Sequence, residues 1–301
     1  MSKNVFEGGS TFDWKSYISY RPDYRLSNFY DLIWDYHLKN GGQWNVAQDV
    51  GCGPGNVTEV LAEKFDKVHA SDANAYIVEV AKSRLGSDKV TFEVARAEDV
   101  TEPQADLITA AECIPLMNQE AAIDAWARLL KPGGTLAIWF YGGPIWPDEE
   151  VELQYLMRKI GSRSCDEFRP FKGTPWERIW TVVSSWLDLL HFPEKDWQSV
   201  KRMKWNNDRE LSFIDMAEYD FEVKYEDMSK NDEVSEKKDR SFWAKQADFA
   251  WAKGFVDAQI PRTKDYETDE VKEMFGKMKD EMGSKTYNIS WPVVLILATK
   301  K

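Results

Sequence analysis

The stretch VAQDVGCGPGNVTEVLAEKF at residues 46–65 decides the fold. Its first five residues are a short apolar run typical of a buried strand, and residues 55–65 have the apolar spacing of a helix. Three glycines alternate between them, Gly51, Gly53 and Gly55, so a ligand can approach the backbone where no side chain blocks it. A strand, a glycine turn and a helix predict a binding site for a phosphate, a dinucleotide or another nucleoside.

The alternation of strands and helices continues beyond this stretch. Further strands are expected at 67–73, 90–97, 105–114 and 135–141, and helices at 75–85 and 119–130. Short apolar strands that alternate with helices predict an α/β fold, with a doubly wound parallel sheet covered on both faces.

After residue 143 this pattern changes. The later segments are predicted to be helices at 142–160 and 174–190, a strand at 197–207, a charged loop at 226–240, a helical stretch at 241–259 and a last strand at 287–301 that Pro292 interrupts. We expect one domain over 1–301, made of an N-terminal arm and helix (1–45), a core (46–142), a helical lid (143–195) and a C-terminal part that completes the sheet (196–301).

Composition restricts the partners. The chain has 39 basic and 51 acidic residues and a net charge of −12, which opposes binding to a nucleic-acid backbone. No apolar run approaches the roughly 20 residues that span a bilayer, and the N-terminal segment lacks the apolar core of a signal peptide. A cytoplasmic protein without a membrane partner is expected. The three cysteines form no CxxC pair, so neither a disulfide framework nor a metal site is predicted.

The glycine spacing fits neither phosphate motif. A dinucleotide fingerprint has the spacing G-x-G-x-x-G, whereas the glycines here have the spacing G-x-G-x-G. A P-loop needs a Lys-Ser/Thr pair after its glycines, and GNVTEV at 55–60 has none. Asp72 ends the next strand, where a carboxylate can accept hydrogen bonds from two ribose hydroxyls, although it could also cap the helix at 75–85. A ribose without a pyrophosphate indicates a nucleoside cofactor such as S-adenosyl-L-methionine, whose sulfonium cation suits an acidic chain.

Four motifs in sequence order resemble those of the class I S-adenosylmethionine-dependent methyltransferases. They are DVGCGPG at 49–55, ASDA at 70–73, ARAED at 95–99 and LLKPGGTLAIW at 129–139. The resemblance implies a Rossmann-like, doubly wound sheet of seven strands with an inserted helical lid. An oxidoreductase that uses a nicotinamide cofactor is a more distant alternative.

The resemblance also implies roles for individual residues. Asp49, Gly51 and Gly53 would line the methionine end of the cofactor, Asp72 would hold the ribose, and Ala73 would pack on the adenine. Ala97 and Glu98 would meet the adenine edge, although Arg96 stands where the family often has an acid. Ala111 and Glu112 would approach the methionine moiety.

A narrower resemblance concerns the N-terminal arm. YISYRPDY at 17–24 is similar to the Tyr-x-x-x-Arg-Pro-x-Tyr arm of fungal trans-aconitate 3-methyltransferase and its relatives, which include methyltransferases of cantharidin and of gliotoxin-type dithiols. IWFYGGPIWPD at 138–148 matches the same group. Tyr17 and Arg21 would then close over cofactor and substrate. The alternative is a surface arm in which Arg21 pairs with an exposed carboxylate.

No general base is evident in the sequence. His37 and His191 are expected at the surface and His69 in the core, and ECIPLMN at 112–118 occupies the place where related enzymes often carry His-Trp. A carboxylate acceptor is already ionised, and a thiol with a pKa of about 8.5 needs little help. The predicted methyl acceptor is therefore a thiol(ate) or a carboxylate.

Aromatic residues suggest a pocket for a larger metabolite. The candidates to line it are Ile114, Trp146, Trp176, Trp180 and Trp251. These side chains favour a gliotoxin-type dithiol over a small triacid, which would need several basic groups. We expect a small-molecule methyltransferase acting as a monomer or weak homodimer. The alternatives are a non-catalytic S-adenosylmethionine-binding module and a protein methyltransferase.

Overall fold

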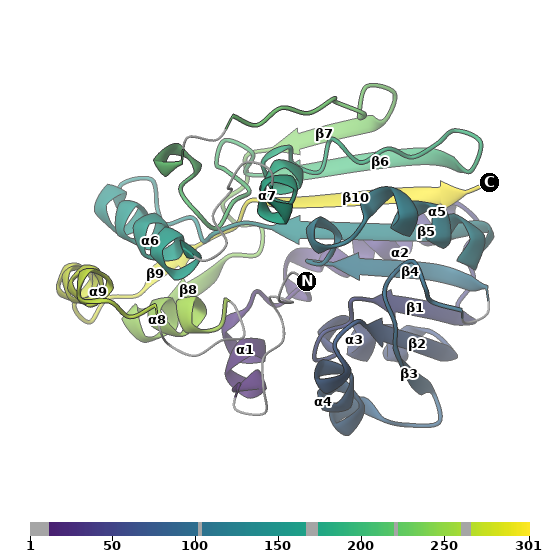
Figure 1. The fold of residues 1–301 in the computed structure, drawn as a ribbon, viewed down its shortest axis with the longest axis horizontal. Helices are drawn as coiled ribbons and strands as arrows, with labels where there is room; N and C mark the ends of the chain where they lie inside the picture. Colours follow the sequence, from purple (N-terminus) through teal and green to yellow (C-terminus); the bar gives the residue numbers. More distant parts are fainter. Residues whose placement is uncertain (1–11, 102–103, 167–173, 220–221, 260–265) are drawn as a thin grey trace.

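An eight-stranded sheet forms the centre of the protein (Figure 1). The computed structural model describes residues 12–101, 104–166, 174–219, 222–259 and 266–301. In spatial order the strands are β3 (Val90–Val94), β2 (Lys67–Asp72), β1 (Val46–Val50), β4 (Ala105–Ala111), β5 (Leu130–Tyr141), β10 (Val293–Lys300), β6 (Trp197–Trp205) and β7 (Glu233–Lys237). Only β10 runs antiparallel to its neighbours in this sheet.

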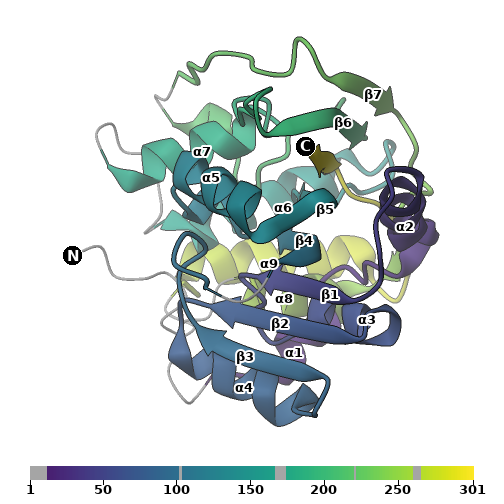
Figure 2. The same cartoon turned by 90° about the vertical axis from the view of Figure 1, so that its right-hand side faces the viewer.

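Helices cover both faces of the sheet, as a doubly wound fold requires. Figure 2 shows α2 (Phe29–Lys39) and α3 (Asn56–Lys64) on one side, and α5 (Gln119–Leu129) and α7 (Pro175–Ser184) on the other. Successive residues of a strand point to opposite faces of the sheet. Leu107 therefore packs into a hydrophobic cluster on one face, and Ile108 into a second cluster on the other face. α4 (Ala75–Leu85) contacts β2 and β3. The predicted fold class is confirmed.

The sheet has one strand more than the seven predicted. β7 lies inside the segment 226–240, which the sequence suggested was a loop, and it pairs in parallel with β6. Its residues are mostly exposed, and Lys201 of β6 pairs with Glu233 at 2.8 Å. A charged edge strand has no apolar alternation, which is why the pattern did not reveal it.

A group of helices lies beyond the carboxyl ends of β1, β4 and β5 (Figure 1). It contains α1 (Trp14–Tyr20), α6 (Val151–Ser164), α8 (Phe249–Asp257) and α9 (Asp269–Met282), with a two-stranded sheet of β8 (Lys245–Ala247) and β9 (Tyr287–Ile289). Short 3-10 turns occur at η1 (Leu26–Asn28), η2 (Ile114–Leu116) and η4 (Met216–Glu218). The prediction of a helical stretch over 241–259 was wrong in its first part, because β8 and the cap residue Asp248 precede α8.

The two helices predicted as a lid separate in the structure. α6 packs against α8 and α9, whereas α7 packs against η2. None of the helices in the described part of the chain is long and apolar enough to cross a membrane.

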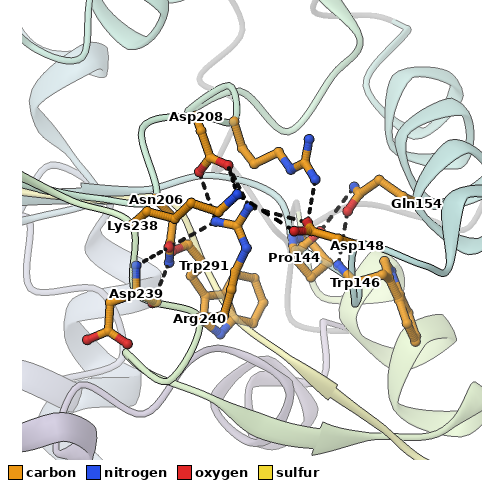
Figure 3. Close-up of polar contacts among 11 residues, drawn as sticks. Pro144, Trp146, Asp148, Gln154, Asn206, Asp208, Lys238, Asp239, Arg240 and Trp291 are labelled. Atoms are coloured by element: carbon orange, nitrogen blue, oxygen red, sulfur yellow. Dashed lines mark hydrogen bonds and ion pairs between the residues drawn. The ribbon is translucent and has the colours of Figure 1, made fainter.

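A polar network fastens the turn after β6 to distant segments (Figure 3). Asn206 accepts a hydrogen bond from the backbone N–H of Asp239 at 2.8 Å, and its amide donates to the carbonyl of Trp291 at 2.9 Å. Arg240 bonds to the same Asn206 side chain and pairs with Asp208 at 2.7 Å. Because Asn206 is fully buried, these bonds satisfy polar atoms that water does not reach.

Candidate functional site

The glycine turn follows β1 at the carboxyl edge of the sheet. Gly51, Gly53 and Gly55 all have positive φ, at 67°, 54° and 91°. A Cβ at Gly51 would lie 2.7 Å from Cys113 Cβ, and one at Gly55 would lie 2.6 Å from Leu85 Cδ1. A Cβ at Gly53 would have no heavy atom within 4 Å. Packing therefore explains two of the glycines, whereas Gly53 faces open space that a ligand can fill.

Asp72 connects this turn to the end of β2. Its Oδ2 accepts the Gly53 N–H at 3.1 Å, and its Oδ1 accepts the Asn74 N–H at 2.9 Å. Burial raises the pKa of the Asp72 carboxyl above its ordinary value, although these backbone N–H groups favour the ionised form. The cap of α4 is Asn74, which accepts bonds from Tyr76 and Ile77, so the alternative of Asp72 as the helix cap was wrong.

The residues predicted to meet the adenine lie near Asp72. Ala73 follows it and is exposed. The Ala95 N–H donates to the Asp72 carbonyl at 3.1 Å, which ties the segment after β3 to this edge. In that segment Ala97 is buried and Glu98 is partly exposed. The tertiary structure thus places these candidates along one edge.

Asp49 supports the turn from within the sheet. It is buried in β1, where it accepts hydrogen bonds from the Thr58 hydroxyl at 2.6 Å and the Thr109 hydroxyl at 2.9 Å. Burial raises the pKa of Asp49 to about 6. Both carboxyl oxygens of Asp49 already accept hydrogen bonds from the protein. Asp49 can therefore stabilise the glycine turn and act on a ligand through its charge.

The raised pKa of Asp49 predicts a pH-dependent stability. Between pH 4 and pH 6 the folded chain binds a proton at Asp49 that the unfolded chain has released, so the free energy of unfolding falls as the pH rises through this range. Relative to an Asp49→Asn variant, which cannot ionise there, the wild type should lose about 2–3 kcal/mol between pH 4 and pH 7. Urea unfolding of both proteins at several pH values measures this difference, and parallel curves would contradict it.

An aromatic pocket lies at the same end of the sheet, among α1, η2 and α7. It holds about 760 Å³ of space not filled by protein atoms and is open to solvent. It unites five residues predicted from the sequence, namely Tyr17, Arg21, Glu112, Trp176 and Trp180. The lining residues that were not among the candidates are Pro115, Leu116, Phe140, Cys165, Ile179, Val183, Phe213 and Gln259. Pro115 and Leu116 belong to the apolar ECIPLMN segment, whereas no sequence pattern marks Phe213 or Gln259.

Three residues predicted to line a substrate pocket do not line this one. Ile114 is fully buried in the core. Trp146 is buried against the ring of Tyr287, with 5.6 Å between the ring centroids. The side chain of Gln154 fixes the loop that carries Trp146, because it accepts a hydrogen bond from the Trp146 N–H and donates one to the Pro144 carbonyl (Figure 3). Trp251 stacks on Phe255 at 5.3 Å in the core. Tryptophans that pack a core and those that line a pocket have the same local pattern in sequence.

Arg21 reaches the interior of the site. Its Nη1 donates to the Tyr141 hydroxyl at 2.7 Å and its Nη2 donates to the Gln259 carbonyl. The guanidinium lies 4.7 Å from the Tyr17 ring centroid, and the buried Nε has no hydrogen-bond acceptor among the described residues. The alternative of a surface arm, with Arg21 paired to an exposed carboxylate, was wrong.

Glu112 is the acid among the described residues that line the pocket. Its Oε1 accepts the Tyr141 N–H at 2.6 Å. Burial raises the pKa of Glu112 well above its ordinary value, and the positive charge of Arg21 acts in the opposite direction. Its neighbour Ala111 ends β4 and is partly buried.

The histidines lie outside the described lining of the pocket. His37, predicted at the surface, is fully buried and is bonded to the Thr135 hydroxyl and the Gln43 carbonyl, both at 2.9 Å. His69, predicted in the core, is partly exposed, and His191 is exposed as predicted.

Comparisons with known proteins identify relatives of this chain. A family profile described as a methyltransferase domain matches residues 47–134. The methyltransferase ptaI of Pestalotiopsis fici is 39% identical, with 96% of this chain and 93% of that protein covered. The methyltransferase cfoB of Aspergillus candidus is 35% identical, with 95% and 94% covered.

The fold has a counterpart among solved structures. A putative type II methyltransferase from Anaeromyxobacter dehalogenans matches with a TM-score of 0.55 and 16% identity, over 89% of this chain and 95% of that one. The cofactor of this family fits the edge described above, because the open space over Gly53 adjoins a carboxylate at Asp72 and an exposed Ala73. S-adenosyl-L-methionine is its cofactor, and the chain belongs to the class I S-adenosylmethionine-dependent methyltransferases.

Proposed function

We propose that this methyltransferase acts on a small secondary metabolite with a flat or apolar body, such as a gliotoxin-type dithiol, and that the methyl group goes to a thiol(ate) or a carboxylate. The observation that supports this proposal is the aromatic pocket, where Trp176, Trp180 and Phe140 share the lining with Arg21. Aromatic walls with few convergent polar groups suit a small molecule of this kind.

The charges in the pocket favour this acceptor over a small triacid of the trans-aconitate type. Arg21 is the cation among the described lining residues, and Glu112 lies in the same pocket. A triacid would bring three carboxylates to a pocket whose described lining has one guanidinium, at Arg21, and one acid, at Glu112. A larger apolar acceptor with a single ionised group needs only the one cation.

The residues have separable roles in this proposal. Asp72 would hold the cofactor ribose, Gly53 would allow close approach, and the aromatic walls would orient the acceptor and exclude water. When bound, S-adenosylmethionine supplies a methyl group on a positively charged sulfur, and S-adenosyl-L-homocysteine is the product. We further propose a cytoplasmic enzyme, monomeric or weakly dimeric, whose partner is the small acceptor rather than a nucleic acid or a membrane.

Calorimetry followed by an acceptor screen tests this function. We expect micromolar binding of S-adenosylmethionine and S-adenosylhomocysteine, and a mass gain of one methyl group on a thiol or an acid detected by mass spectrometry. Binding without turnover on a broad panel of acceptors would instead support a non-catalytic binding module. Methylation confined to peptide substrates would contradict the small-molecule acceptor.

A further inference from the structure

Glu112 stands where the cofactor edge meets the acceptor pocket. It directly follows β4, which pairs with β1, and the next residue, Cys113, packs against Gly51 of the glycine turn. Glu112 nevertheless lines the aromatic pocket, whereas the described lining includes no residue of the glycine turn. Its carboxyl group interacts electrostatically with Arg21, which lines the same pocket, so we place Glu112 on the acceptor side of this boundary.

The two oxygens of the Glu112 carboxyl group have different surroundings. Oε1 is held by the Tyr141 N–H at 2.6 Å, and no described residue donates a hydrogen bond to Oε2. The backbone of Glu112 has a φ of +59°, a left-handed conformation that is strained at a non-glycine residue. A carboxyl group in a fixed orientation with one oxygen free can accept a proton from a molecule in the pocket.

Tyr141 positions both charged groups of the pocket. Its backbone N–H holds Glu112, and its hydroxyl accepts the hydrogen bond from Arg21 at 2.7 Å. The buried Nε of Arg21 adds a donor that has no acceptor among the described residues. An acid and a guanidinium are thus brought to one pocket, where the guanidinium can stabilise an anion that forms there.

We propose that Glu112 is the general base of the methyl transfer, and that the enzyme therefore also accepts a weakly acidic hydroxyl group on an aromatic ring. This inference rests on the proposed function and extends its acceptor class beyond thiols and carboxylates. As the acceptor oxygen bonds to the methyl carbon, its O–H bond breaks and the proton passes to Oε2 of Glu112. The carbon–sulfur bond of the donor breaks with its electron pair remaining on sulfur, and Glu112 then releases the proton to solvent.

The environment of Glu112 suits this role. Burial raises the pKa of its carboxyl well above the ordinary value, and a base is most effective when its pKa approaches the working pH. Arg21 keeps its positive charge at all relevant pH values, so it would stabilise the negative charge that develops on the acceptor oxygen as the proton leaves. The sequence revealed no general base, and this was the reason to restrict the acceptor to a thiol(ate) or a carboxylate. With Glu112 as the base, that restriction no longer applies.

A matched pair of acceptors tests the proposal in the Glu112→Gln variant. The hydroxyl of 1-naphthol is protonated at neutral pH, whereas that of 2,4-dinitro-1-naphthol is ionised because its nitro groups withdraw electrons. We expect kcat/KM for 1-naphthol to fall by roughly a hundredfold or more, and that for the dinitro compound by less than about fivefold. Glu120→Gln, an equivalent change at an exposed residue of α5, should alter neither.

Calorimetry with S-adenosylhomocysteine separates this role from cofactor binding. Glu112→Gln should bind S-adenosylhomocysteine within about threefold of the wild-type affinity. A proton acceptor that faces the aromatic acceptor pocket contributes little to the binding of the cofactor product. A large loss of this affinity, together with equal losses on both naphthols, would show that Glu112 holds the methionine moiety and would overturn the proposal. Wild-type enzyme that methylates thiols or acids but neither naphthol would overturn the acceptor class.

A second variant protects the test against loss of folding. Glu112→Asp keeps the acid and should retain more activity on 1-naphthol than Glu112→Gln. Equal residual activity in these two variants would mean that the carboxyl group transfers no proton. Failure of the proposed function itself would look different, because the wild-type chain would then bind S-adenosylmethionine but methylate no small molecule in the acceptor screen.

Discussion

The Gly53→Leu variant should bind S-adenosylhomocysteine roughly a hundredfold more weakly than the wild type, or worse, while remaining folded. A Cβ at this position meets no heavy atom within 4 Å, so the new side chain would extend into the open space over the turn without displacing protein. We propose that the cofactor occupies that space. Calorimetric titration measures the loss directly.

Gly41→Leu is the matched control for this substitution. Gly41 also has a positive φ, at 87°, and a Cβ there would also have no neighbour within 4 Å. It precedes the amino end of β1, whereas Gly53 follows the carboxyl end. Both variants should lose about 1–2 kcal/mol of stability from the left-handed backbone, and only Gly53→Leu should lose binding. Equal affinities in the two variants would place the cofactor elsewhere.

The Asp72→Ala variant should bind S-adenosylmethionine more than about tenfold more weakly than the wild type. The Asp72 carboxylate lies at the end of β2 beside Gly53, where it can accept hydrogen bonds from the two ribose hydroxyls. Hydrogen bonds to a charged group contribute roughly 1.5–3 kcal/mol each. Unchanged affinity would show that the ribose assignment is wrong.

A double comparison with a modified ligand isolates the ribose contact. The 2′-deoxy analogue of S-adenosylhomocysteine lacks one of the two hydroxyls, so the wild type should bind it more weakly than the parent compound. Asp72→Ala should bind both compounds with similar affinity, because the partner of the missing hydroxyl is gone. Asp88→Ala, at an exposed acid before β3, should behave as the wild type does. Asp72 also receives two backbone N–H bonds, so thermal unfolding of each variant must accompany the titrations.

Prediction from the sequence succeeded where local chemistry decides the structure. The helix expected at 75–85 has those bounds in the structure, and the strand, glycine turn and helix at 46–65 occur as expected. The charged edge strand β7 and the buried His37 were not foreseen. In both cases a partner distant in sequence determines the outcome, with β6 beside the strand and Thr135 beside the histidine.

The amino-acid sequence by itself determined the fold class, the family and the cofactor, because apolar alternation and ordered glycine and acidic motifs act over a few residues each. Only the tertiary structure decided which aromatic residues line the pocket and which charged side chains meet there. Arg21 meets Tyr141 and Gln259, which lie 120 and 238 residues away, and Glu112 faces the tryptophans of α7. Trp146 and Trp251 entered the core while Trp176 and Trp180 reached the pocket, because burial depends on the neighbours that folding supplies rather than on the residue type.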